Sequence, residues 1–257
     1  MEGALQEMKG IDLNNILENN YYEILNLNKY RKSPSPGASA SKPKYVIDID
    51  GDIAYFKFGL PANEICAEIM AYHIAVKLGI PIAQTKLAVY KGDIGVASYD
   101  IGEYIEPSDE VSYSIKDYLG IGSFIEMCLF DYLVMNEDRH CRNWGIQNGL
   151  IAPLYDHNIC FSIQSDITDM DYTMVHLTSA FYVNTEYEQR YDTILKFLLE
   201  NFKEKVYTYL DSLDDLSDFT VPVLERVYPA EYKQIMDILQ YRIEYMRMKV
   251  RKWQTEF

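Results

Sequence analysis

The sequence predicts an α+β protein with two lobes, a β-rich N-terminal half and a mostly helical C-terminal half. Up to about residue 105, short apolar segments alternate with turns that contain Gly and Asp, which is typical of strands. Beyond that point, longer segments carry apolar residues at helical spacing. The chain of 257 residues is long enough for one large domain or for two small lobes that share a cleft.

The first part of the chain is polar and contains one low-complexity stretch. Residues 1–32 are rich in Asn and Glu, and we interpret them as an N-terminal extension. The sequence SPSPGASASKPK follows at 33–44, and its composition alone favours a flexible linker. Its position favours a second interpretation, because it runs directly into two strands. A Gly- and Ser-rich loop on a hairpin can cover phosphate groups with its backbone N–H groups.

The rest of the first lobe, which we place at 33–102, is expected to consist of two strand pairs around one helix. Apolar residues recur at helical spacing over 63–78, and Gly79 ends that helix. Turn signals at 50–52 and 91–93 separate the members of each strand pair. The strands are expected at 45–48, 53–58, 81–90 and 95–105.

The second lobe, 103–257, is expected to be helical around a short strand pair. The segment 123–135 is apolar apart from Glu126 and Asp131, which predicts a buried helix. Amphipathic helices are predicted at 191–201 and 231–253, and short strands at 144–147 and 151–155.

Charge and cysteine content exclude several classes of protein. With 24 basic and 39 acidic side chains the net charge is −15, which argues against direct nucleic-acid binding, because phosphate contacts need a basic surface. The four cysteines lack metal-ligand spacing and are interpreted as free thiols in a reducing compartment. The N-terminus lacks the apolar region of a signal peptide, and no apolar run is long enough to span a membrane. We therefore expect a cytoplasmic protein without a membrane partner.

The most informative segment is N-E-D-R-H-C-R-N at 136–143, followed by P-L-Y-D at 153–156. Phosphoryl transfer needs one carboxylate that orients the attacking hydroxyl, and oxygen ligands that hold Mg²⁺ on the phosphates. Asp138 fits the first role, while Asn143 and Asp156 fit the second. Each residue alone has a simpler explanation as a turn residue or a surface ion pair. Their combination after a buried helix predicts a kinase site.

The first lobe contains the matching groups. Lys57 lies in an apolar strand, where it either points to solvent or enters a cleft to pair with phosphates. The next helix offers Glu64 and Glu68, one turn apart, as ion-pair partners of that lysine. Near the lobe junction, the segment 98–103 is expected to form a hinge whose backbone, at Tyr99 and Ile101, binds adenine.

These motifs resemble those of the HipA-like serine/threonine kinases, a branch of the protein-kinase-like fold. The N-x-D-R/G-H-x-x-N catalytic loop of that family matches 136–143, and its P-x-Y-D metal motif matches 153–156. Its helix ends in a Leu-Gly-Ile-like turn that matches 78–80, and counting back from this turn assigns the helix glutamate to Glu68. Its phosphate loop looks like the Ser-rich stretch, and the residues that this resemblance assigns to the nucleotide are Ser35, Gly37, Ser39, Ser41 and Lys44.

The resemblance implies an ATP- and Mg²⁺-dependent serine/threonine protein kinase with Asp138, Asn143 and Lys57 as catalytic residues. It also implies autophosphorylation on a loop serine, a toxin–antitoxin role and an antitoxin-type protein partner. Relative to this family, we expect the N-terminal part of the sequence to be too short for the extra small domain that longer members carry. Two alternatives stay open: a kinase with a small-molecule or lipid acceptor, and a non-catalytic module of the same fold that binds nucleotide.

Overall fold

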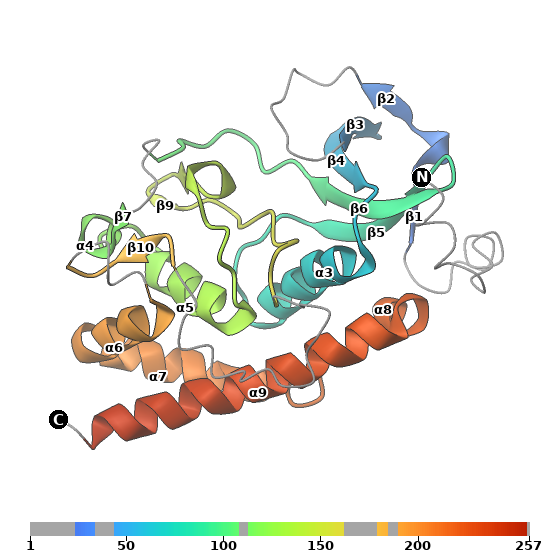
Figure 1. Ribbon diagram of the computed structural model, residues 1–257. Helices are drawn as coiled ribbons and strands as arrows, with labels where there is room; N and C mark the ends of the chain where they lie inside the picture. Colours follow the sequence, from blue (N-terminus) through green and yellow to red (C-terminus); the bar gives the residue numbers. More distant parts are fainter. Residues whose placement is uncertain (1–23, 34–43, 108–112, 162–178, 185–189, 256–257) are drawn as a thin grey trace.

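The computed structural model describes residues 24–33, 44–107, 113–161, 179–184 and 190–255, which form a β-sheet lobe and a helical lobe (Figure 1). The N-terminal lobe is a curled six-stranded sheet with one long helix against it. The C-terminal lobe is a group of helices with two short two-stranded sheets among its described residues, and an isolated bridge between Ile82 and Leu154 connects it to the first lobe. In the part of the chain that the structure describes, no helix is both long and apolar enough to cross a membrane.

The sheet has the strand order β1-β5-β6-β4-β3-β2. β1 pairs parallel with β5, and all other neighbours are antiparallel. The two strand pairs expected from the sequence are present, although β6 ends at Tyr99, six residues before the expected end. The strands are β1 (Leu25–Asn26), β2 (Arg31–Ser33), β3 (Lys44–Ile49), β4 (Asp52–Phe58), β5 (Thr85–Tyr90) and β6 (Asp93–Tyr99), and a 3-10 turn, η1 (Leu27–Lys29), separates the first two.

The pairing of β2 with β3 places the Ser-rich segment between two neighbouring strands of the sheet. Ser33 lies opposite Val46 in the antiparallel register, and the chain between these strands is 34–43, outside the described residues. The sheet also includes β1 and β2, so it begins at Leu25, before residue 33, where we placed the lobe boundary from the sequence. The sequence around 25–33 is too polar and its strands are too short for the period-2 pattern to reveal them.

The two faces of the sheet have different partners. Leu87, Val89, Ile94 and Val96 pack with helix α3 (Ala62–Lys77) in the main hydrophobic core. The opposite face carries a separate cluster centred on the fully buried Phe56. Because side chains alternate along a strand, Lys57 points to the same face as α3. The predicted helix at 63–78 is therefore present, and it lies on the face toward which Lys57 points.

The helical lobe is built on α5 (Phe124–Val134), whose side chains are buried except for Glu126. The long helix α9 (Pro229–Gln254) contacts both α3 and α5, and Figure 1 shows it running beneath both lobes. The remaining elements of the lobe are β7 (Tyr113–Ser114), α4 (Ile115–Tyr118), β10 (Phe181–Tyr182), α6 (Tyr191–Asn201), α7 (Lys203–Ser212), η5 (Leu213–Leu216) and α8 (Pro222–Val227).

The junction between the lobes contains the catalytic-loop segment. A 3-10 turn, η2 (Cys141–Asn143), is followed by the hairpin of β8 (Ile146–Gln147) and β9 (Leu150–Ile151). The two strands expected at 144–147 and 151–155 are thus shorter than predicted. From Leu154, the chain returns to the first lobe, where its backbone pairs with the segment that precedes β5.

Candidate active site

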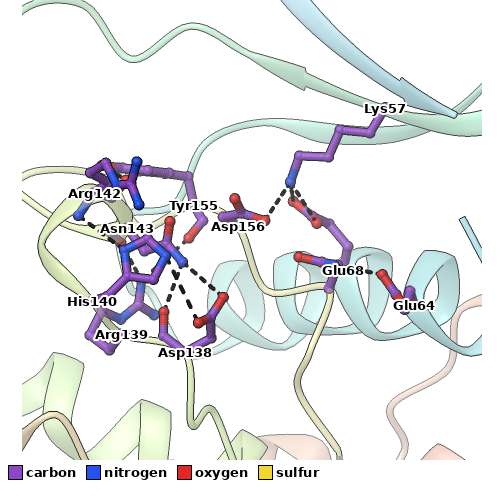
Figure 2. Close-up of polar contacts among 11 residues, drawn as sticks. Lys57, Glu64, Glu68, Asp138, Arg139, His140, Arg142, Asn143, Tyr155 and Asp156 are labelled. Carbon is purple, nitrogen blue, oxygen red and sulfur yellow. Dashed lines mark hydrogen bonds and ion pairs between the residues drawn. The ribbon is translucent and has the colours of Figure 1, made fainter. Parts of the chain in front are cut away.

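The side chain of Lys57, on β4, contacts carboxylates from both lobes. Its Nζ atom lies 3.1 and 3.0 Å from the two carboxylate oxygens of Glu68 on α3. It also lies 2.7 Å from Oδ1 of Asp156, which comes from the second lobe (Figure 2). The lysine therefore does not point to solvent: its side chain is 16% exposed and its ammonium group faces carboxylates of both lobes.

Charge pairing sets the protonation of this group. Burial disfavours the charged lysine, but the carboxylates of Glu68 and Asp156 outweigh burial and raise the pKa of Lys57. Burial also opposes ionisation of Asp156, yet the nearby Lys57 ammonium lowers the pKa of that carboxyl below its ordinary value. Lys57 is therefore a cation and Asp156 an anion at neutral pH, as binding of phosphate and metal requires.

The two glutamates of α3 have different partners. Glu68 is almost fully buried and contacts Lys57, and the backbone of His157 hydrogen bonds to its carboxylate. Glu64, one turn earlier, accepts a hydrogen bond of 2.7 Å from Nδ2 of Asn158. Both glutamates thus face the segment that follows Asp156, but only Glu68 reaches the lysine. The assignment by counting from the Leu78-Gly79-Ile80 turn selects the same residue.

The catalytic-loop segment begins where α5 ends, at Met135 in the left-handed region with φ 58°. The side chain of Asn136 then connects the helix to the loop. Its Nδ2 donates to Oδ1 of Asp131 at 2.9 Å, and its Oδ1 accepts from the backbone N–H of Asp138 at 3.1 Å. These bonds fix the backbone at Asp138.

Asp138 and Asn143 are brought together across this loop. Nδ2 of Asn143 donates to the backbone carbonyl of Asp138 at 2.7 Å and to its carboxylate Oδ2 at 3.2 Å. The Asp138 side chain remains 36% exposed and open to an acceptor, whereas the Asn143 residue is buried. Burial raises the pKa of Asp138, against the opposing effect of His140. A carboxylate with a raised pKa is a better proton acceptor.

Arg139 holds the segment from inside the protein, with its side chain only 1% exposed. Its Nε and Nη2 atoms form a two-point contact with the carboxylate of Asp131, at 2.9 and 2.6 Å. Its Nη1 atom donates to the backbone carbonyls of Asn143, at 2.6 Å, and Tyr155, at 3.3 Å. Asn143 is one candidate metal ligand, and Tyr155 directly precedes the other, Asp156. One buried ion pair thus positions both candidate metal ligands.

The Asp131–Arg139 pair was not among the residues singled out from the sequence. A signal was present, because Asp131 interrupts an otherwise apolar buried helix, and a carboxylate in such a place needs a cationic partner. Its partner cannot be found by helical spacing, since Arg139 lies beyond the end of α5.

Two histidines have structural contacts here. Nε2 of the buried His157 lies 2.8 Å from Nη2 of Arg139. Burial and the neighbouring cations lower the pKa of His157 well below its ordinary value, so the ring is neutral and Nε2 accepts the hydrogen bond. His140 accepts a hydrogen bond from the backbone N–H of Arg142 at 3.2 Å. Neither ring is placed as the general base.

The expected hinge is the extended segment after β6. The side chain of Tyr99 packs on the sheet face away from α3, so on the α3 side this residue presents only its backbone. The carbonyl of Ile101 accepts a hydrogen bond from Gln147 Nε2. The backbone N–H of Ile101 has no hydrogen-bond partner among the described residues, which leaves a donor for a nucleobase.

Only part of the expected phosphate loop can be placed. Ser35, Gly37, Ser39 and Ser41 lie outside the described residues. Lys44, at the start of β3, lies directly opposite Lys57 in the β3–β4 register, and its Nζ is 5.3 Å from the centre of the Tyr55 ring. The loop is thus joined to the sheet beside the lysine that contacts Glu68 and Asp156.

The chemistry of the donors at this site fits Mg²⁺. Asn143 uses its amide nitrogen on Asp138, so its amide oxygen is available as a ligand. Asp156 uses Oδ1 on Lys57 and retains Oδ2, and its backbone adopts the left-handed region with φ 59°. Hard oxygen ligands are those that Mg²⁺ prefers. Two protein ligands leave room for phosphate oxygens and water. No cluster of three or more His, Cys, Asp and Glu suited to a metal occurs in the described ranges.

Comparisons with known proteins support the fold. No protein-family model and no curated protein matches the sequence. Among solved structures, the chain is similar to CtkA, a proinflammatory kinase of Helicobacter pylori, with a TM-score of 0.70 and 18% identity over 89% of this chain and 99% of CtkA. It also aligns with HipA of Shewanella oneidensis, solved as a toxin–antitoxin complex with HipB and operator DNA. That alignment has a TM-score of 0.49 and 10% identity, and it covers 94% of this chain and 71% of HipA.

The first of these similarities extends over nearly the whole of both chains, so it includes both lobes and the junction between them. The α+β architecture expected from the sequence is thus confirmed, and the chain shares the fold of the kinase CtkA. The chain has the two-lobed fold of a kinase.

Proposed function

We propose that this protein is an ATP- and Mg²⁺-dependent kinase of the HipA-like type that transfers the γ-phosphate to serine or threonine hydroxyls of a protein. The observation that carries the proposal is the triple contact of Lys57 Nζ with Glu68 and Asp156. A lysine held by a helix glutamate and placed beside a metal-binding aspartate is the arrangement that kinases use to hold nucleotide phosphates.

In this mechanism, Lys57 binds phosphate oxygens while Glu68 keeps its ammonium group in place. Asn143 and Asp156 would hold Mg²⁺, which neutralises charge on the phosphates. Asp138 accepts a hydrogen bond from the acceptor hydroxyl and orients its oxygen toward the γ-phosphate. The hydrogen bonds from Asn143 to Asp138 fix the position of the proton acceptor relative to the residue that would bind the metal. As the O–P bond to the acceptor forms, the bond between the γ-phosphorus and the oxygen bridging to the β-phosphate breaks and ADP is the leaving group, while the hydroxyl proton passes to the Asp138 carboxylate.

The Ser-rich loop and the partner belong to the same proposal. The loop residues Ser35, Gly37, Ser39 and Ser41, together with Lys44, would cover the phosphates, and one of the serines would be modified by the kinase itself. The hinge backbone at Tyr99 and Ile101 would bind the adenine. A growth-arrest role with an antitoxin-type protein partner is what the resemblance of the motifs implies. The cytoplasm is the proposed location because the cysteines are interpreted as free thiols in a reducing compartment.

The proposal is tested by nucleotide binding followed by phosphate transfer. Thermal unfolding of the full chain is recorded with ATP, with and without Mg²⁺, and γ-labelled ATP is then supplied to detect label on the protein or on added protein substrates. Lys57→Met should lose both the stabilisation by ATP and the transfer. Lys86→Met is the matched control, because Lys86 also lies in the sheet but alternates to the opposite face, beside Ala88 of the separate cluster.

Each result has a definite meaning. Binding and transfer that depend on Lys57 but not on Lys86 support the kinase. Binding without any transfer would support the non-catalytic nucleotide-binding module. Label found only on small-molecule or lipid acceptors would replace the protein-kinase assignment.

A further inference from the structure

The side chain of Gln147 fastens the hinge segment to the hairpin that follows the catalytic loop. Its Nε2 atom lies 2.9 Å from the backbone carbonyl oxygen of Glu103 and 3.2 Å from that of Ile101. Both partners are carbonyl oxygens, which only accept hydrogen bonds. The amide NH₂ group of Gln147 must therefore face them, and one side chain uses both of its donors on the same segment.

The two carbonyls that Gln147 binds lie on either side of Gly102, the glycine of the hinge segment 98–103. Gly102 lies between the two bonded residues and has φ +78°, in the left-handed region. Glycine has more accessible backbone conformations than other residues, so the backbone of this segment is most flexible at Gly102 unless other contacts fix it. By binding the carbonyls on both sides, Gln147 restricts the backbone at this point.

The same segment is attached to the hairpin at further points. Ile105 and Ile146 exchange two backbone hydrogen bonds of 2.9 Å. A Cβ atom at Gly145 would lie 2.2 Å from a ring carbon of Tyr104, so the close contact at this position requires glycine. The hydroxyl of Tyr155 donates to that of Tyr104 at 2.9 Å. The bonds of Gln147 are the ones that reach closest to the end of β6.

We propose that Gln147 is a positioning residue for the nucleotide, holding the carbonyls of Ile101 and Glu103 so that the hinge backbone has a fixed shape for the nucleobase. The inference rests on the proposed kinase function and adds a residue that no motif pointed to. Each carbonyl oxygen has a second lone pair, and the N–H of Ile101 has no partner in the described structure, so the hinge retains groups for a base.

The contacts of Gln147 predict which kinetic constant its truncation will change. No hydrogen bond joins it to Lys57, Asp138 or Asn143, so truncation leaves the groups at the phosphates in place. The hinge, in contrast, loses two hydrogen bonds beside a glycine. Binding of the base then weakens equally in the ground state and the transition state, which raises KM without lowering kcat.

The test uses the full chain and four proteins: wild type, Gln147→Ala, Gln147→Glu and the control Gln240→Ala, which truncates an exposed glutamine on α9. Steady-state kinetics with Mg-ATP give kcat and KM, and Mg-tripolyphosphate, which has no base, is measured as a competitor. For Gln147→Ala we expect KM for ATP to rise by about tenfold, as loss of two neutral hydrogen bonds allows, with kcat near the wild-type value. Gln147→Glu should raise KM further, because it sets a carboxylate against two carbonyl oxygens.

The competitor distinguishes positioning of the base from general damage to the cleft. Its inhibition constant should be the same in all four proteins. An unchanged KM in both Gln147 variants would overturn the inference, and so would tighter ATP binding, which would mean that Gln147 competes with the base for the hinge. Parallel losses of ATP and tripolyphosphate affinity would assign Gln147 a purely structural role. If the wild type itself neither binds nor uses ATP, the proposed function fails instead.

Discussion

Lys57 and Asp156 are 99 residues apart in the sequence and come from opposite lobes, yet Lys57 Nζ lies 2.7 Å from Asp156 Oδ1. The same Nζ atom binds Glu68 on α3, so one ammonium group joins the sheet, the helix and the segment after the catalytic loop. The lobes are therefore closed on each other at the site where phosphates are expected, and the groups need no large movement to act together.

This ion pair predicts a pH dependence of stability. Lys57 lowers the pKa of Asp156 in the folded protein, so near pH 4 the native state binds fewer protons than the unfolded chain. The contribution of Asp156 is therefore complete above about pH 5 and is lost as the pH falls through its lowered folded pKa. Urea unfolding of wild type and Asp156→Asn should show a difference that shrinks from pH 6 to pH 3. A difference that stays constant over this range would contradict the lowered pKa.

Asp156 also provides a test of the metal assignment. A ligand at about 100-fold its Kd stabilises a protein by roughly 2–3 kcal/mol. ATP with Mg²⁺ should reach this range in the wild type, and Asp156→Ala should remove most of the part that depends on Mg²⁺. The measurement is thermal unfolding with ATP, with and without the metal. Asn143→Ala should act in the same direction, and an unchanged shift in both variants would exclude these residues as ligands.

Asp138→Asn separates catalysis from binding. The amide keeps the shape of the side chain but cannot accept the hydroxyl proton, so phosphoryl transfer should fall by about 10²–10⁴-fold. Affinity for nucleotide, measured by calorimetry, should stay close to that of the wild type, because Asp138 contacts neither Lys57 nor Asp156 through a hydrogen bond. A joint loss of binding and transfer would indicate a structural role for this carboxylate.

The buried pair of Asp131 and Arg139 should be a large contributor to stability. Asp131→Asn leaves the Arg139 guanidinium buried, 1% exposed, without a counter-charge, and such changes typically cost about 3–5 kcal/mol. Denaturant unfolding measures this cost. Lys205→Ala is the control, since it breaks an ion pair with Glu126 whose side chains are 51% and 38% exposed, and it should cost about 0–1 kcal/mol. Equal costs for the two variants would mean that the buried pair is not the anchor of the loop.

The sequence predicts this fold well because its strands and helices have clear periods. The strands on either side of Gly51, the helix α3 and the buried helix α5 all lie within two residues of their expected bounds. Asp138 and Asn143 lie beside each other because both belong to one short loop, and their catalytic and metal-binding roles stay a prediction.

Other features depend on contacts that local patterns do not encode. β1 and β2 are two and three residues long and are held by pairing with β5 and β3. Strands this short show no alternating pattern of apolar residues in the sequence. The partner of Asp131 lies past the end of its helix, and the hinge bonds of Gln147 join positions 44 and 46 residues apart. The expected strand at 95–105 ends early: Tyr99 pairs with Ala54 of β4, the backbone N–H of Asp100 still donates to the carbonyl of Ile53 at 2.8 Å, and the chain then leaves the sheet at Gly102, which has a positive φ.

The Ser-rich loop provides the last prediction, and it separates a phosphate loop from a flexible linker. β2 and β3 pair with each other, so the segment 34–43 joins neighbouring strands in the sheet that carries Lys57. Phosphorylation at Ser35, Ser39 or Ser41 would add about 1.5–2 negative charges, which ATP phosphates repel. The modified protein should therefore bind ATP more weakly and be cut more readily by proteases between Ser33 and Lys44. Intact mass after incubation with Mg-ATP, compared with Asp138→Asn, detects the modification. If ATP binds but no phosphate is added to the active protein, this segment does not regulate the kinase and is a linker.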